Sequence, residues 1–213
     1  MLTSANKYPF FELLEIIPEI DLVYKCYQPL KPLKAGNFIP DLSFKREQLR
    51  WQRFHGGTET FGPVLSIQLL NKPLVISFYS KHWGENGLEQ LIRLNFIQNE
   101  IKANGGNLLI INADNDEDLA KTAWENDLSL NFYFDENHEI AELFGVYSEN
   151  YPVWDRFSGI DVNVPLLATY VIDQFKQVVF ADIDMDLTGS FSANGIIAAV
   201  YESALLRSSK KSA

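Results

Sequence analysis

The order of short apolar runs and longer amphipathic stretches constrains this chain most. Residues 74–78 form an apolar run after Pro73, which predicts a buried strand. Residues 88–101 then repeat leucine and isoleucine at helical spacing, and Gly105-Gly106 predicts the end of that helix. Residues 108–111 form a second apolar run. This order predicts an α/β protein, because a crossover helix brings the chain back to a parallel strand.

The alternation continues to the end of the chain. Asn115 or Asp116 is the expected cap of the next helix, whose apolar face is formed by Leu119, Ala120, Ala123 and Trp124. The other expected elements are strands at 131–134, 168–172 and 177–183, a short helix at 139–144 and a final helix at 192–207. With its closing hairpin, this order is that of an α/β thioredoxin-like fold, in which a central mixed β-sheet is flanked by helices.

The chain divides into an extension, one domain and a tail. In residues 1–32, apolar side chains at helical spacing stop at Pro18 and two further prolines follow, so we expect a helical extension and a linker. Residues 33–207 form the thioredoxin-like domain, and residues 208–213 are expected to be a flexible tail. Residues 42–63 contain Gly56-Gly57 and predict a long hairpin or a surface excursion.

The composition and charge of the chain limit the kinds of partner and the cellular compartment that we expect for it. The formal charge of −10 repels phosphate backbones and anionic membranes, so we expect neither nucleic acid nor a membrane as partner. The N-terminus lacks a signal-peptide pattern and no apolar run reaches ~20 residues, which predicts a cytoplasmic protein. The single cysteine, Cys26, excludes a disulfide and a two-cysteine redox cycle within one chain.

Six segments within residues 33–205 resemble the alkyl hydroperoxide reductase and thiol-specific antioxidant branch of the peroxiredoxins. Residues 72–83 are similar to the strand that leads into the active-site loop of that family. The resemblance implies the thioredoxin-like fold, thiol-dependent reduction of peroxides and a homodimer. The six segments are residues 33–42, 72–83, 111–114, 134–135, 144–145 and 168–173.

The same resemblance places the two active-site cysteines of the family at Gly84 and Gly87. In the family, the first cysteine attacks peroxide and the second often resolves the sulfenic acid. The cis-proline of the family corresponds to Leu167, where we expect a trans peptide bond and a reshaped loop. The arginine that holds the thiolate corresponds to Ser190. Because glycine has no thiol, we expect no thiol peroxidase activity at this loop.

The loop still has the features of a binding site. A helix that begins there leaves backbone N–H groups without intrahelical partners, which favours a ligand where a pocket surrounds them. In the alternative hypothesis these side chains are structural, because Trp83 packs and Glu85 interacts with the helix dipole while Asn86 faces solvent. The residues expected to line a pocket for a small molecule or a partner protein are Tyr79, His82, Trp83, Glu85 and Asn86.

No residue pattern predicts a metal or a cofactor. His82 and Glu85 lack a third ligand, and the acidic residues at 114–118 fit helix caps better than a calcium loop. We therefore expect neither group in this protein. The aromatic residues Tyr147, Tyr151, Trp154 and Phe157 predict either an interface or a cover over the sheet.

Three functions remain open at this point. The first is a non-catalytic protein that uses the fold as a scaffold or to bind a ligand. The second is an antioxidant oxidoreductase that acts through Cys26 or through the thiols of a partner. A hydrolase or lyase based on His82 and Glu85 is the third, although one histidine and one carboxylate do not define a reaction class.

Overall fold

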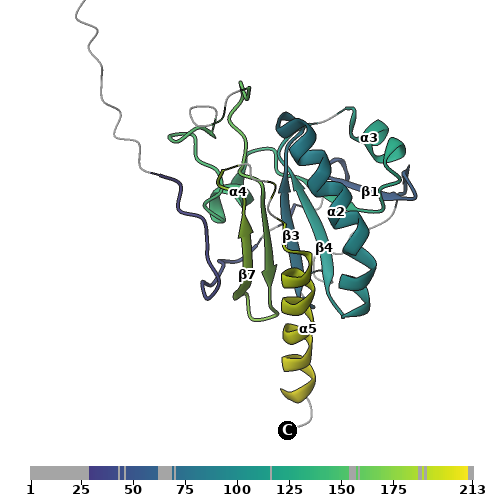
Figure 1. Ribbon diagram of the computed structural model, residues 1–213, viewed down its shortest axis with the longest axis vertical. Helices are drawn as coiled ribbons and strands as arrows, with labels where there is room; N and C mark the ends of the chain where they lie inside the picture. Colours follow the sequence, from purple (N-terminus) through teal and green to yellow (C-terminus); the bar gives the residue numbers. More distant parts are fainter. Residues whose placement is uncertain are drawn as a thin grey trace, which may run out of the picture.

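A computed structural model of the chain describes residues 29–42, 44–45, 47–61, 69, 71–115, 117–153, 157, 159–186, 189 and 191–210. Seven strands form one sheet in the order β2-β1-β5-β4-β3-β6-β7, and helices lie on both of its faces (Figure 1). The expected N-terminal helix and Cys26 lie outside the described residues. The predicted mixed sheet between helices is confirmed.

The central strands arise from residues that are buried on both faces of the sheet. Strand β3 (Leu74–Tyr79) is buried at every position and pairs with β4 (Asn107–Asn112) in parallel and with β6 (Ala168–Ile172) antiparallel. Unbroken burial is typical of an inner strand covered on both sides. Strand β5 (Asn131–Phe134) is parallel to β4, and β7 (Val178–Ile183) forms one edge, antiparallel to β6.

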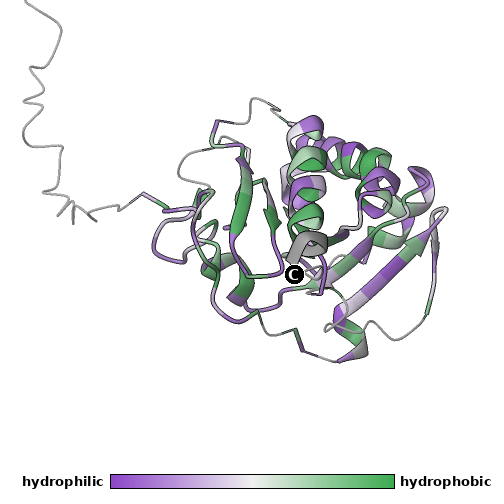
Figure 2. Cartoon of the chain, turned by 90° about the horizontal axis from the view of Figure 1, so that it is seen from below, coloured by the Kyte–Doolittle hydropathy of each residue, from purple (hydrophilic) through white to green (hydrophobic). Residues whose placement is uncertain are grey.

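Among the described residues, helices α2 (Gly84–Ala103), α3 (Leu119–Glu125) and α5 (Ala193–Lys210) cover one face of the sheet and α4 (Glu139–Leu143) covers the other. Helices α2 and α5 lie side by side, and α3 shares their apolar cluster with the inward side chains of the sheet. Figure 2 shows green and purple residues on the same helices, as expected of amphipathic helices. Helix α4 packs on the opposite face, within the second apolar cluster.

The predicted hairpin at residues 42–63 is present and extends the sheet. Strands β1 (Trp51–His55) and β2 (Thr58–Glu59) pair antiparallel around Gly56 and Gly57, whose φ angles are 54° and 72°. Positive φ at both turn residues suits a tight hairpin. Strand β1 also pairs with β5. The segment is therefore part of the sheet and not a surface excursion.

Two details of the predicted helices are wrong. Helix α3 has Asp118 as its N-cap residue instead of Asn115 or Asp116, and Asp116 lies outside the described residues. Trp124, expected on the apolar face of that helix, is 69% exposed. It lies on the outer side because Leu119 and Ala123 already fill the contact with the core.

The predicted tail begins within a helix. Helix α5 continues through residue 210, three residues beyond the predicted end. Residues 208–210 belong to this helix, whereas residues 211–213 lie outside the described residues.

Candidate functional site

Trp83 contacts the segment before β6 from its place at the start of α2. It ends a short 3-10 helix, Lys81–Trp83, and α2 follows it directly. Its Nε1 donates to the carbonyl oxygen of Pro165 at 2.7 Å, and its ring meets Phe157 with centroids 5.4 Å apart. The side chain is buried in the apolar cluster on the α4 face. Trp83 thus packs, as the structural alternative expected.

The two cysteine positions of the resemblance differ in their surroundings. Gly84 is exposed, and no atom lies within 4 Å of the place a Cβ would take, but its φ of 55° favours glycine. Gly87 is buried, and a Cβ there would lie 3.1 Å from the carbonyl oxygen of Ser80 and 3.2 Å from Cε2 of Tyr79. A side chain at Gly87 would therefore require these neighbours to shift by a few tenths of an ångström.

The other residues predicted to line a pocket lie in different surroundings. Tyr79 is buried and packs against Phe132, with ring centroids 6.4 Å apart, in the cluster on the α2 face. Glu85 and Asn86 are exposed on the first turn of α2. His82 lies apart from them, beside the end of β4. Of the five predicted residues, Asn86 lines the hollow described below.

His82 lies beside a carboxylate that sequence reasoning did not pair with it. Its Nε2 is 3.7 Å from Oδ1 of Asp114, and Oδ2 of Asp114 accepts the backbone N–H of Lys81 at 2.8 Å. Asp114 follows β4, and His82 follows the adjacent parallel strand β3. Parallel strands bring their carboxyl ends to the same edge, so this pairing could have been found from the strand order.

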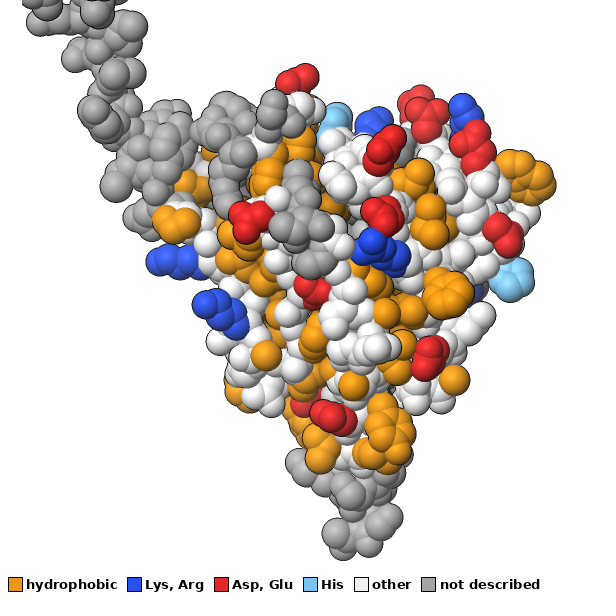
Figure 3. All heavy atoms as spheres, in the orientation of Figure 1, with side chains coloured by type: hydrophobic (Ala, Val, Ile, Leu, Met, Phe, Trp, Pro, Cys, Tyr) orange, Lys and Arg blue, Asp and Glu red, His pale blue; other side chains and the backbone are white. Residues whose placement is uncertain are grey.

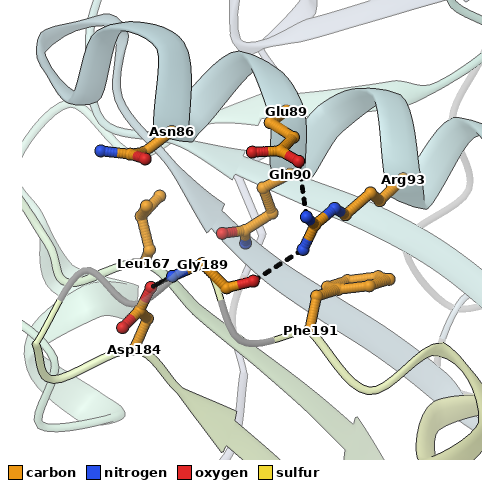
Figure 4. Close-up of a pocket in the computed structure, with 8 residues that line it drawn as sticks. All are labelled: Asn86, Glu89, Gln90, Arg93, Leu167, Asp184, Gly189 and Phe191. Carbon is orange, nitrogen blue, oxygen red and sulfur yellow. Dashed lines mark hydrogen bonds and ion pairs between the residues drawn. The ribbon is translucent and has the colours of Figure 1, made fainter.

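A hollow lies along α2, about one turn beyond Gly87. It encloses ≈ 280 Å³ of space, including the part that opens to solvent. Leu167, which the resemblance places at the cis-proline position of the family, lines it, and the described residues contain no cis peptide bond, as expected for Leu167. Ser190 lies outside the described residues. Figure 4 shows the lining residues: Asn86, Glu89, Gln90, Arg93, Leu167, Asp184, Gly189 and Phe191.

Arg93 on α2 forms a hydrogen bond to the segment after β7. It donates to Oε1 of Glu89, four residues earlier on the helix, and to the carbonyl oxygen of Gly189 at 2.7 Å. Its guanidinium carbon lies 5.9 Å from the ring centroid of Phe191. Sequence reasoning missed Arg93. The spacing of Glu89 and Arg93 signals an ion pair on a helix, but nothing in it points to Gly189.

A buried polar network lies beneath the hollow. Gln90 on α2 donates from Nε2 to Oγ of Ser77 on β3 at 2.6 Å. Ser77 Oγ is 2.9 Å from Oγ1 of Thr169 on β6. Both hydroxyl-bearing residues are buried. The network joins the helix to two central strands and fixes the orientation of the Gln90 amide.

The aromatic residues before β6 cover the sheet where the structure describes them. Tyr147 stacks on His138 with ring centroids 4.1 Å apart, and Phe157 packs on Trp83. Tyr147 and Phe157 both pack against the apolar cluster of the α4 face. Trp154 lies outside the described residues. The contacts of Tyr147 and Phe157 fit a cover over the sheet.

The described residues include neither a cluster of metal ligands nor a membrane-spanning helix. No group of three or more His, Cys, Asp or Glu side chains is placed there to hold a metal ion. No helix in this part of the chain is long and apolar enough to cross a bilayer.

A protein-family model, the AhpC/TSA family, matches residues 36–181, which is more than half of the sequence. The chain belongs to the AhpC/TSA family. This AhpC/TSA chain is 26% identical over 162 residues to Peroxiredoxin Bcp of Escherichia coli strain K12, covering 72% of this chain and 94% of that protein. The family expected from the six segments is confirmed.

Solved structures show the same fold for this AhpC/TSA protein. Peroxidoxin BcpB from Mycobacterium tuberculosis matches with a TM-score of 0.54 at 18% identity, over 82% of this chain and 97% of that one. Xanthomonas campestris Peroxiredoxin Q matches with a TM-score of 0.53 at 20% identity, over 76% and 97%. At these identities the likeness concerns the fold alone. The thioredoxin-like fold is confirmed.

Proposed function

We propose that this AhpC/TSA protein has no thiol peroxidase activity and acts as a non-catalytic binding or scaffold protein. The observation that supports the proposal most is the start of α2. A peroxidatic thiolate there would need a cysteine at Gly84 or Gly87, and glycine occupies both positions. The space beside Gly87 is filled by Ser80, Trp83 and Tyr79.

The packing around the start of α2 is intact, but the thiol groups that would reduce a peroxide are absent there. Trp83, Leu167 and the Ser77 network hold α2 against β3 and β6. Such a framework can present a surface or hollow to a ligand without performing a reaction. A hollow between α2 and the segment after β7 is lined by Leu167 and by residues of the first turns of α2, and it supports binding as the role of this protein.

A peroxide-consumption assay tests the proposal. Wild-type protein and Cys26→Ser are incubated with hydrogen peroxide or cumene hydroperoxide and a dithiol reductant, and the loss of peroxide is followed. We expect both proteins to consume peroxide at the rate of the protein-free control. Turnover by the wild type that is lost in Cys26→Ser would establish the thiol oxidoreductase instead. Turnover by both proteins would equally refute a non-catalytic role.

A further inference from the structure

We propose that two copies of this chain associate through the outer surface of α2 and α5. A band of exposed hydrophobic side chains runs over both helices on the face shown in Figure 3. Association at this surface does not depend on the proposed absence of peroxidase activity. The members of this apolar band are Ile92 and Phe96 on α2 and Tyr201, Leu205 and Leu206 on α5.

The apolar band faces away from the core of its own domain. Ile196 and Val200 of α5 are buried in the cluster on the α2 face. Tyr201 and Leu205, one turn apart on the same helix, are 50% and 48% exposed, and Phe96 on α2 is 86% exposed. A surface helix usually carries polar residues on its outer face. Apolar residues on the outer faces of two adjacent helices therefore indicate a surface that another molecule covers.

The end of α5 projects beyond the sheet (Figure 1). Leu205 and Leu206 lie in this last part of the helix, and both are about half exposed. Most of the stability of a helix in a protein comes from the packing of an apolar face, because short helices are marginal in water by themselves. A second copy that packs on these turns would bury both leucines and stabilise the end of the helix.

The directions of the two helices allow each copy to cover the other. Helix α2 returns from β3 to the parallel strand β4, and α5 packs back on the sheet after β7, which runs parallel to β3. Both helices therefore run antiparallel to β3. A two-fold axis perpendicular to them places α5 of one copy antiparallel to α2 of the other, and reciprocally. The 18 residues of α5 and the 20 residues of α2 span about 27 Å and about 30 Å, so their lengths match.

Charge favours this antiparallel arrangement. Glu85 and Glu89 are exposed on the first turns of α2, and Glu89 pairs with Arg93 of its own chain. The last turn of α5 contains Arg207 and Lys210. Antiparallel packing brings this basic end of one copy toward the acidic start of α2 in the other, twice in a symmetric dimer. Opposite charges at the rim of an apolar interface favour one orientation over the others.

The apolar band is large enough to contribute to a stable dimer. The rings of Phe96 and Tyr201 alone expose roughly 250 Å², and three aliphatic side chains add to this area. A standard interface buries about 800 Å² on each partner, and about 60% of that area is apolar. The apolar band thus supplies a large part of the apolar area that each partner needs.

Sedimentation equilibrium of the full chain over a concentration series tests the inference. We expect a monomer–dimer equilibrium whose dissociation constant rises about 10- to 100-fold on Phe96→Glu and on Leu205→Glu, because each substitution places two carboxylates in the interface. Circular dichroism verifies that both variants stay folded, as expected for exposed positions. Phe38→Glu is the matched control and should leave association unchanged, since Phe38 is also largely exposed but lies beside Gln177, just before β7.

A chain that is monomeric at every concentration would overturn the inference. A dimer that withstands both Phe96→Glu and Leu205→Glu would also overturn it. Loss of the dimer on Phe38→Glu would place the interface at the edge strand β7 instead. The combined substitution Arg207→Glu and Lys210→Glu should weaken the dimer about 3- to 10-fold, and an unchanged dissociation constant would refute the antiparallel arrangement. Peroxide turnover is not measured by this experiment, so the proposed function is tested separately.

Discussion

Nε1 of Trp83 donates a hydrogen bond to the carbonyl oxygen of Pro165 across 82 residues of sequence, at 2.7 Å. This bond joins the residue before α2 to the residue two positions before Leu167. This tryptophan thus holds together the segment that contains Gly84 and Gly87 and the segment that leads to Leu167.

Trp83→Phe should lower the free energy of unfolding by about 1–3 kcal/mol, because the carbonyl of Pro165 is left buried without its donor. Urea denaturation followed by circular dichroism measures the change. Trp124→Phe is the matched control, since Trp124 is largely exposed and should shift stability little. Equal effects of the two substitutions would show that the Trp83 bond does not stabilise the fold.

Gly145→Ala should destabilise the protein and displace the linker before the domain. A Cβ at Gly145 would lie 2.2 Å from the carbonyl oxygen of Lys31, and the φ of 67° is itself unfavourable for alanine. Gly159→Ala separates the two costs, because Gly159 has a φ of 89° but open space around it. The denaturation midpoint should fall clearly further for Gly145→Ala than for Gly159→Ala. Similar midpoints would mean that the linker contact contributes nothing.

Cysteine introduced at the two replaced positions should behave differently, in a Cys26→Ser background. Gly87→Cys places a side chain into a filled space and should cost about 1–3 kcal/mol, as overpacking does. Gly84→Cys meets open space and bears only the strain of its backbone angle. Reaction with a thiol-specific disulfide reagent should be faster at position 84 than at position 87. Faster reaction at position 87 than at position 84 would contradict the tight packing around Gly87.

Asp135 should give a pH-dependent contribution to stability. Burial raises the pKa of Asp135, although its carboxylate accepts backbone N–H groups from Ile140 and Ala141 at 2.9 and 3.0 Å. With the folded-state pKa above the unfolded value of about 3.9, the contribution is most favourable below that value and is lost as pH rises through the folded-state pKa. The difference in unfolding free energy between wild type and Asp135→Asn should therefore fall as pH rises.

Urea denaturation of both proteins at a series of acidic to neutral pH values measures this difference. Asp161→Asn, at an exposed position, is the control and should show a much flatter difference. A difference between wild type and Asp135→Asn that rises with pH would mean that its backbone hydrogen bonds outweigh burial.

Tyr170→Phe should leave stability unchanged or raise it by up to about 1–2 kcal/mol. The hydroxyl of Tyr170 is buried and has no hydrogen-bond partner among the residues that the structure describes, and burial raises the pKa of Tyr170. Removing a polar group that makes no bond removes its desolvation cost while the ring keeps its contacts with Phe78 and Phe144. A clear loss of stability would show that the hydroxyl has a partner in solution, such as a bound water.

The local elements of the fold could be predicted from the sequence. Strands β5 and β6 have the bounds expected at 131–134 and 168–172, and β3 extends the predicted 74–78 by one residue. Short runs that are mostly apolar and lie inside a sheet leave little choice of structure, because both faces of an inner strand are covered. The absence of a thiol at positions 84 and 87 could also be read directly from the sequence, because both residues are glycine.

The contacts around those glycines were decided only by tertiary structure. Nothing in the sequence places Arg93 against Gly189 or Gln90 above Ser77, because these pairs come from elements that meet only when the sheet is assembled. The pairing of β1 with β5 was missed for the same reason. By itself the sequence determined the order of strands and helices and the glycines at positions 84 and 87. Packing between distant segments decided that the space at Gly87 is tight and that a hollow opens beside α2, because side-chain contacts depend on how the layers meet.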